Sequence, residues 1–398
     1  MMEDTRYNFY EVVDSANAYF DKYGRTKGSG WKGFARWKNE NESKFYPTGV
    51  RTATDFYHVS KAYQEVLSEQ GLKTKTSFDN GWNELGPWDA NNVTSHYSPG
   101  IGRIETFWVN PNNNQHLFLG SRSGGFWKTT DGGTTWKNTT DFLVASGVFT
   151  LAVNPFNFDE VLISVQHGGL GYTHGIYRST DGGETWNITK FEPQNLNWGG
   201  LGDNERIYVI KYHPTIQNRV YVGSTKGLFY SEDNLDSWTQ SFNGRPTDIE
   251  FHTSKDSVIY VFNNNGTDRN HVKTSRDLGK TFTNSNVIAD NNNAKGHLSL
   301  TTANDKNVYF ASNNGVWKSN DEGQNFTFLS NPEENCQGFA ISDIDSTHMI
   351  YGYVDAQSSR DGGLNFAKAT KWAVQDDAYI HADIRALECL DGVFYVGT

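Results

Sequence analysis

One octapeptide pattern recurs six times along this chain and constrains its fold more than any other feature. It reads Ser/Thr-x-Asp-x-Gly-x-Thr-Trp/Phe and first occurs as TTDGGTTW at residues 129–136. Later copies replace individual positions, and the third has Leu235 where the glycine is expected. Successive copies lie 40 to 52 residues apart, the period of one four-stranded propeller blade. The aspartates of this repeat motif are Asp131, Asp181, Asp233, Asp277, Asp321 and Asp361.

The residue types in the repeat motif suit a tight turn between two strands. Gly133 can take the positive φ that such a turn needs, and Asp131 can accept backbone N–H groups two residues on, as in an Asx-turn. Trp136 begins the next strand, where we expect it to pack back on the blade. One carboxylate per loop is far below the roughly six to eight oxygens that calcium takes. We therefore predict a structural motif, with no metal and no cofactor.

Three further strand-like segments precede each motif. In the first repeat they are ETFWVNP (105–111), QHLFLGS (115–121) and GFWKTT (125–130). Such runs of apolar and aromatic residues between turn signals are typical of short β-strands. Each repeat is therefore predicted to be one blade of four strands.

A seventh repeat begins at DIRALECLDGVFYVGT (383–398) and contains two strands but no motif. We predict an all-β propeller over residues 81–398 with about seven blade starts, the last incomplete. A segment such as WNELGP (82–87) could supply the missing strands, or the sequence could be a piece of a longer protein.

Residues 1–80 differ from the rest and are predicted to form a helical segment docked on the propeller. Segments 8–24 and 52–70 have apolar residues at helical spacing. Residues 28–49 between them are aromatic and basic, which could suit nucleic acid, but we favour docking on the next domain. The apolar face of the first helix is predicted to contain Phe9, Val12, Val13, Ala16 and Phe20.

Charge and composition limit the classes of partner. The net charge of the 398 residues is -11, which argues against nucleic acid and against anionic membrane surfaces. No stretch approaches the roughly 18 apolar residues of a membrane span. The two cysteines, Cys336 and Cys389, are too few for a disulfide scaffold, and the sequence leaves open whether they form one bridge. No signal peptide is visible at the N-terminus, which leaves the location undecided.

The six motifs resemble the Asp-box repeats shared by sialidases, xyloglucan-specific glucanases and sortilin-type receptors. The resemblance covers roughly residues 100–398. It implies a propeller whose motifs lie at the blade periphery, away from the binding face. Because one fold hosts many functions, it leaves the activity open.

A closer resemblance is to large exported proteins of bacteria that use type IX secretion. It rests on residues 8–24, on W-x-x-L-G-P at 82–87, on GRI at 102–104 and on IHADIRAL at 380–387. The last is similar to an HxDxHxL element, with Arg385 in place of the second histidine. The resemblance implies a secreted or cell-surface protein that reaches the secretion machinery through a C-terminal domain, which this sequence does not contain.

Three arginines in the first strands are candidate ligand-binding residues: Arg103, Arg206 and Arg385. Sialidases hold a carboxylate with three arginines, and guanidinium geometry suits that task. The Arg-Ile-Pro signature is missing, because Glu105 follows Arg103 and Ile104. The alternative is that these arginines pair with carboxylates around the central channel.

His381, Asp383 and Arg385 alternate along a predicted inner strand and would share one face. His381 and Arg385 are therefore ligand-binding candidates, and Asp383 is the catalytic candidate. A glycosidase needs a second carboxylate across a groove. Asp343, Asp345 or Glu250 could provide it, while a solvated ion pair is the alternative for the Asp383 face.

Two loops, 167–175 and 195–206, carry the aromatic residues Tyr172 and Trp198. Both are candidates for stacking on a carbohydrate, although Trp198 could equally be a packing residue. Because the repeats are strong and no catalytic set is complete, we favour a propeller that binds glycans or protein partners through its axial face. The alternative is a glycoside hydrolase of sialidase or xyloglucanase type.

Overall fold

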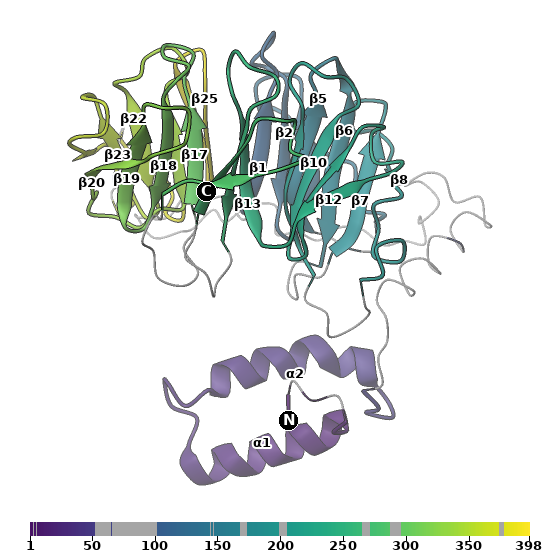
Figure 1. Cartoon of the computed structure of the whole chain (residues 1–398). Coiled ribbons are helices and arrows are strands. Elements are labelled where there is room, and N and C mark those ends of the chain that lie inside the picture. Colours follow the sequence, from purple (N-terminus) through teal and green to yellow (C-terminus); the bar gives the residue numbers. More distant parts are fainter. Residues whose placement is uncertain are drawn as a thin grey trace. The chain divides into compact units, whose positions relative to one another are not determined.

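The computed structural model describes most of the chain, which separates into two compact units (Figure 1). The described residues of the first unit lie within 1–73, and those of the second unit lie within 102–398. The predicted helix over 52–70 and the segment 82–87 lie outside the described part, apart from Glu65. The described residues are 1–51 apart from 3 and 5, 65, and 102–398 apart from 144, 146, 168–172, 199–204, 265–270, 287–295 and 374–377.

In the first unit, two antiparallel helices pack around a small aromatic core. Helix α1 (Phe9–Tyr23) is capped by Asn8, whose side chain accepts from Tyr10 N at 2.9 Å while Glu11 accepts from Asn8 N at 3.1 Å. This reciprocal pair of bonds satisfies donors that a helix N-terminus leaves open. The predicted apolar face is confirmed, because four of its residues are buried and Ala16 packs beside them.

The second helix, α2 (Trp31–Phe45), lies in a segment for which the sequence analysis predicted no helix. Its sequence is strongly polar, and the helical signal is confined to Trp31, Phe34 and Trp37. These side chains recur every three residues and pack against Phe20 and Phe9 of α1. The aromatic content of this segment is therefore explained by packing within the first unit.

The first three blades of the second unit are four-stranded antiparallel sheets whose strands follow chain order. Blade 1 comprises β1 (Ile104–Val109), β2 (Leu117–Ser121), β3 (Gly125–Thr129) and β4 (Lys137–Asn138). Blade 2 comprises β5 (Gly147–Asn154), β6 (Asn157–Gln166), β7 (Thr173–Ser179) and β8 (Asn187–Ile188). Blade 3 comprises β9 (Ile207–Tyr212), β10 (Val220–Ser224), β11 (Gly227–Ser231) and β12 (Thr239–Phe242).

Blades 4 to 6 repeat this order, and a sheet of two strands follows them. Blade 4 comprises β13 (Pro246–Phe251), β14 (Ile259–Asn263), β15 (His271–Ser275) and β16 (Thr283–Asn284). Blade 5 comprises β17 (Gly296–Leu300), β18 (Val308–Ser312), β19 (Gly315–Ser319) and β20 (Thr327–Ser330). Blade 6 comprises β21 (Gly338–Ile341), β22 (Met349–Gly352), β23 (Ala356–Ser359) and β24 (Ala367–Lys368), and the last sheet comprises β25 (Ala386–Leu390) and β26 (Val393–Gly397).

The innermost strands close into a ring. Each of β1, β5, β9, β13, β17, β21 and β25 contacts the next, and β25 contacts β1. Ile104 N donates to Thr398 O at 3.0 Å where the two ends of the ring meet. The predicted all-β propeller is confirmed, with six four-stranded blades in the described residues. The expected number of about seven is slightly too high, because the seventh member of the ring is a two-stranded sheet.

The hydrophobic core lies between neighbouring blades rather than at the centre. Separate apolar clusters fill the successive interfaces from blades 1 and 2 to blade 6 and the last sheet. Because strand side chains alternate between two faces, each of blades 2 to 6 contributes to two such clusters. The ring axis is therefore lined by polar and charged side chains as well as apolar ones.

The repeat motifs form turns that satisfy their own polar groups. Ser179 Oγ donates to Asp181 Oδ1 at 2.7 Å and accepts from Gly183 N at 2.8 Å. Asp181 accepts from Thr185 N at 2.9 Å and from Thr185 Oγ1 at 2.6 Å. The aspartate therefore reaches four residues ahead, not two as the Asx-turn prediction had it, and these bonds help to hold its pKa at about 2 despite the opposing desolvation.

Two motifs depart from the common pattern in informative ways. Leu235 replaces glycine in the third copy yet keeps φ at 70°, a conformation that costs an ordinary residue about 1–2 kcal/mol. Its side chain is 1% exposed within a core cluster, and this burial offsets the strain. Trp136 of the first copy is 36% exposed, whereas Trp186 of the second is buried against Phe126 of the preceding blade. The preceding sheet for Trp136 has two strands, so the predicted packing of Trp136 is only partial.

The serine of a motif is expected to contribute measurably to stability. Ser179→Ala removes a buried hydroxyl that serves two backbone N–H groups and one carboxylate. We expect the free energy of unfolding to fall by about 1–3 kcal/mol, the typical cost of leaving buried partners unpaired. Chemical denaturation measures this, with Ser257→Ala in an exposed turn as the control. Equal stabilities of the two variants would contradict a structural role for the motif.

Candidate functional site

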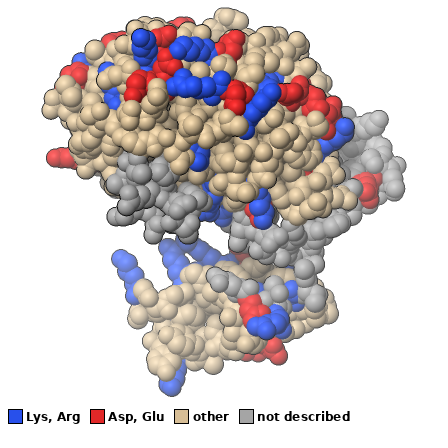
Figure 2. Space-filling view, in the orientation of Figure 1, with Lys and Arg blue, Asp and Glu red and all other residues tan. Residues whose placement is uncertain are grey.

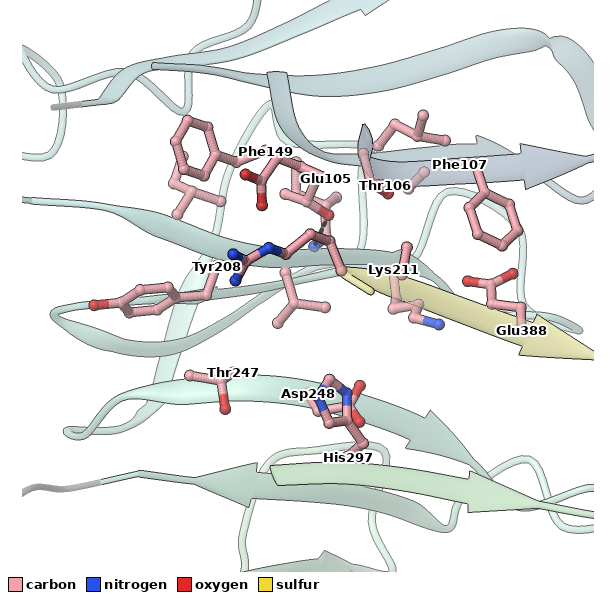
Figure 3. A pocket seen from close by; sticks show the side chains of 18 of the residues that line it. Glu105, Thr106, Phe107, Phe149, Tyr208, Lys211, Thr247, Asp248, His297 and Glu388 are labelled. Atoms are coloured by element: carbon pink, nitrogen blue, oxygen red, sulfur yellow. Dashed lines mark hydrogen bonds between the residues drawn. The ribbon is translucent and has the colours of Figure 1, made fainter. Parts of the chain in front are cut away.

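A cavity of about 610 Å³ occupies the ring axis of the second unit. Its lining includes residues from all seven inner strands, so it is the central channel of the propeller. Figure 3 shows side chains from several of these strands pointing into it. This volume lies within the range of small-ligand pockets.

Five arginines gather at one end of this channel, and we name them the arginine mouth. Four of them directly precede an inner strand, and the fifth directly follows β2. Since all inner strands start at the same end of the ring and β2 runs antiparallel to β1, the five share that end. Motif turns join third to fourth strands and therefore lie at the opposite end. The arginine mouth consists of Arg103, Arg122, Arg206, Arg245 and Arg385.

Carboxylates balance only part of the charge at the arginine mouth. Glu105 forms an ion pair with Arg103 and lies 4.0 Å from Arg122. Asp383 lies 3.6 Å from Arg385. Burial, together with the neighbouring Arg385 and Arg122, lowers the pKa of Arg103, while Glu105 opposes this shift.

The remaining two arginines, Arg206 and Arg245, form no ion pair with any residue that the structure describes. Among the residues that the structure describes, the mouth therefore carries an excess of positive charge. On the propeller face shown in Figure 2, by contrast, Lys and Arg are interspersed with Asp and Glu.

The channel wall near this mouth also holds buried polar atoms without a partner. Gln166 at the end of β6 is 0% exposed, and its Nε2 donates to Ile207 O at 2.6 Å. Its Oε1 accepts no hydrogen bond from the described residues, nor do the Nε atoms of Arg103 and Arg385 donate one there. Such atoms cost free energy unless a ligand or water pairs with them.

Farther along the inner strands lies an inner charged cluster of Lys211, Asp248, Glu250 and Glu388. Lys211 Nζ of β9 bonds Glu250 Oε1 of β13 at 3.2 Å. Figure 3 shows Lys211 and Glu388 pointing toward each other. The side chains of Lys211 and Glu250 are 34% and 30% exposed, but only to the space enclosed by the ring. We therefore treat them as buried charges.

Enclosure and mutual repulsion shift the pKa values of this cluster. Burial, reinforced by Glu250, raises the pKa of Asp248 to about 7, although Lys211 and the N–H groups of Leu298 and Ile249 oppose the shift. Burial likewise raises the pKa of Glu388. Glu250 raises the pKa of Lys211, which keeps its proton. The cluster thus combines a lysine cation with two carboxyl groups, Asp248 and Glu388, that resist ionisation.

The structure brings the three predicted arginines, Arg103, Arg206 and Arg385, to one cavity. The predicted strand carrying His381, Asp383 and Arg385 is wrong, because β25 begins only at Ala386. Asp383 has φ of 75°, which breaks the alternation. Neither His381 nor Asp383 lines the channel in the described residues, and Asp383 lies beside Arg385 at a half-exposed position, as in the ion-pair alternative.

The carboxylates proposed as partners of Asp383 are separated by the structure. Asp343 accepts from the N–H groups of Asp391 and Gly392 in the β25–β26 turn. Asp345 accepts from Thr347 N and is exposed. Glu250 alone faces the channel, where it joins the inner charged cluster.

Trp198 packs inside the propeller and does not project from a loop. It is 8% exposed and its ring lies 5.8 Å from that of Phe191. The packing alternative therefore describes Trp198, and it is not available for stacking on a ligand. Tyr172 lies outside the described residues, so its predicted role stays a prediction.

Sequence reasoning missed Arg122, Arg245, Lys211, Asp248 and Glu388. A signal for part of this set exists in the repeats. Lys211, Glu250 and Glu388 face Tyr221, Tyr260 and Tyr395 on the second strand of their own sheets, so they occupy the same repeat position. That position is Trp108, Ala152, Ser299 or Ala340 in the other blades. An alignment of the first strands of the repeats would have revealed these three charged residues at one position.

Cys336 and Cys389 form no disulfide. In the described part of the chain, no group of three or more His, Cys, Asp and Glu side chains is placed to hold a metal ion. None of the described helices has the length and apolar character needed to cross a bilayer.

Comparison with known proteins supports the fold. No family model and no curated protein matches the sequence. Among solved structures, a GH74 xyloglucanase from Xanthomonas campestris has a TM-score of 0.53 at 16% identity, covering 67% of this chain and 45% of that one. A GH74 enzyme from Niastella koreensis has 0.51 at 15% identity, covering 75% and 42%. The chain thus spans less than half of each GH74 enzyme.

A third similar structure is YCF48 bound to a D1 peptide. It has a TM-score of 0.53 at 15% identity, and the match covers 75% of this chain and 91% of that one. At these identities the likeness shows a shared propeller fold and does not transfer an activity.

The raised pKa of Asp248 predicts a pH dependence of stability. The folded protein holds this proton up to about pH 7, whereas an unfolded aspartate releases it near about 3.9. The unfolding free energy should therefore fall as the pH rises between these values. Asp248→Asn should flatten this decline.

Chemical denaturation across that pH range measures the effect. Asp345→Asn is the control, because hydrogen bonds from Thr347 lower the pKa of Asp345 and place its titration below the range. Equal slopes for the original protein and Asp248→Asn would show that Asp248 ionises normally.

Proposed function

We propose that this protein is a binding propeller that recognises a carboxylate-bearing partner through the arginine mouth. The observation that carries the proposal is the excess of guanidinium groups there, with Arg206 and Arg245 lacking an ion pair among the described residues. Guanidinium groups bind carboxylates through paired, charge-assisted hydrogen bonds. Enclosure by the ring strengthens such bonds relative to bulk water.

We propose further that the protein acts outside the cell or at its surface. The resemblance of residues 8–24 and 380–387 to exported proteins supports this location. The repeat motifs resemble Asp-box repeats, which occur in proteins with glycan ligands and in proteins with protein ligands. This resemblance supports a ligand of either kind. YCF48, a propeller of similar fold, is described as bound to a peptide, which supports a protein ligand.

A glycoside hydrolase is the second candidate function, and one observation favours it. Asp248 and Glu250 lie near each other, and the pKa of Asp248 is raised to about 7. A carboxyl group whose pKa is raised by its surroundings, beside a second carboxylate, is typical of glycosidase sites. The fold shared with GH74 enzymes is consistent with this candidate. Its weakness is Lys211, which already binds Glu250.

The binding proposal predicts that the arginine mouth holds anionic probes. An oligoglutamate peptide blocked at both ends should bind saturably at low salt. Arg206→Gln with Arg245→Gln should weaken binding at least about tenfold, since charge-assisted bonds contribute about 1.5–3 kcal/mol each. Calorimetric titration measures the affinity. Arg360→Gln, an exposed arginine in the sixth motif, should bind as the original protein does, and an equal loss in this control would refute the proposal.

The hydrolase candidate is tested on a panel of sialosides and β-glucans. Turnover that disappears in Asp248→Asn would favour the hydrolase over the binding propeller. Turnover that disappears in Asp383→Asn would also favour the hydrolase, and it would identify Asp383 as the catalytic residue. Absence of turnover together with binding of the anionic peptide supports the binding function.

A further inference from the structure

We infer that the arginine mouth recognises the free C-terminal carboxylate of a polypeptide. This inference rests on the proposed function and narrows its ligand class. It depends on two features of the channel. One is an acceptor, set among the arginines, that has no partner in the described residues, and the other is an inner layer in which carboxyl groups outnumber the single lysine.

The unpartnered acceptor is Gln166 Oε1. Gln166 is fully buried, and its amide is fixed by the bond from Nε2 to Ile207 O, next in sequence to Arg206. This bond orients the amide, and its carbonyl oxygen can only accept a hydrogen bond. It lines the same cavity as the five arginines. A matching ligand therefore presents anionic oxygens and, close to them, one hydrogen-bond donor.

The C-terminal residue of a peptide carries this combination in one rigid unit. Its carboxylate and its own N–H are separated by a single Cα, so both groups can meet the mouth with few rotors fixed. A glutamate side chain carries its carboxylate several rotatable bonds away from the nearest N–H. A C-terminal amide has no anionic oxygen at all.

The inner charged cluster explains why the ligand would be a chain end. It contains three carboxylates against the single Lys211, with Glu250 bonded to Lys211 across neighbouring blades. Above about pH 7, where Asp248 is ionised, an anion that passes the arginines meets a layer of net negative charge, so it is held at the mouth. A peptide N-terminus carries the opposite charge and would be repelled by the arginines.

The apolar part of the wall suits the last side chain of such a peptide. Phe149 lies under the Arg122 guanidinium at 5.2 Å and lines the same cavity. Its ring can pack against an aliphatic side chain while the arginines hold the carboxylate. A leucine-terminated peptide is therefore the probe of choice.

The test compares an acetylated alanine peptide ending in leucine, with a free or an amidated C-terminus, by calorimetric titration against the whole chain. The free acid should bind at least about tenfold more tightly, since the amide forfeits charge-assisted bonds. Gln166→Met should lower the affinity for the free-acid peptide about tenfold. Gln115→Met, an exposed glutamine at the motif end, should leave its affinity unchanged. Thermal melts of both variants exclude misfolding as the cause.

Several outcomes would overturn this inference. Equal binding of acid and amide peptides, with retained binding of the blocked oligoglutamate, would reject the C-terminal reading and leave the proposed function standing. Binding of oligogalacturonate without binding of the acid peptide would assign the mouth to acidic glycans. Failure of every anionic probe would reject both the inference and the proposed function.

Discussion

Contact between neighbouring inner strands is the constraint on which the rest of the propeller depends. Short polar bonds reinforce it: Leu298 N donates to Asp248 Oδ2 at 2.6 Å, and Ile341 N donates to Ser299 Oγ at 3.0 Å, each joining strands of different blades. Closure between Ile104 and Thr398 completes the ring. Because apolar side chains fill the blade interfaces, the ring leaves an axial channel where charges face one another across an enclosed space.

The two ends of this ring differ in how fully their polar groups are satisfied. At the motif end, each aspartate accepts hydrogen bonds from its own loop, and these bonds help to lower its pKa. Little capacity remains there for a ligand. At the other end, arginines outnumber carboxylates, and Gln166 Oε1 has no partner in the described residues. A ligand gains most where unpaired groups already carry a cost, which is why the arginine mouth, and not the most conspicuous sequence pattern, carries the proposed function.

The sequence predicted the features that depend on local chemistry. Strand order, blade period and the motif turns follow from patterns within about fifty residues. Helix α2 was not predicted from the sequence, because the role of its three aromatic residues becomes clear only from their packing on α1. The inner charged cluster escaped because ring closure brings Lys211 close to Glu388, which is far away in sequence. The strand predicted to carry Asp383 does not form, because Asp383 itself has a left-handed backbone conformation. The alternation of residue types along the sequence does not reveal such a local change.

The channel therefore has one layer rich in arginine and one rich in carboxyl groups, and their separation follows from the repeat. Each arginine stands at or before the start of an inner strand or at the end of β2, whereas Lys211, Glu250 and Glu388 share one position deeper along the inner strands. Asp248 gains a full negative charge only as the pH rises through about 7, so the inner layer becomes more negative across neutral pH. The arginines stay charged throughout, because a guanidinium does not deprotonate in this range. The boundary between the layers thus sharpens as the pH rises, and an anionic group is confined more strictly to the arginine mouth.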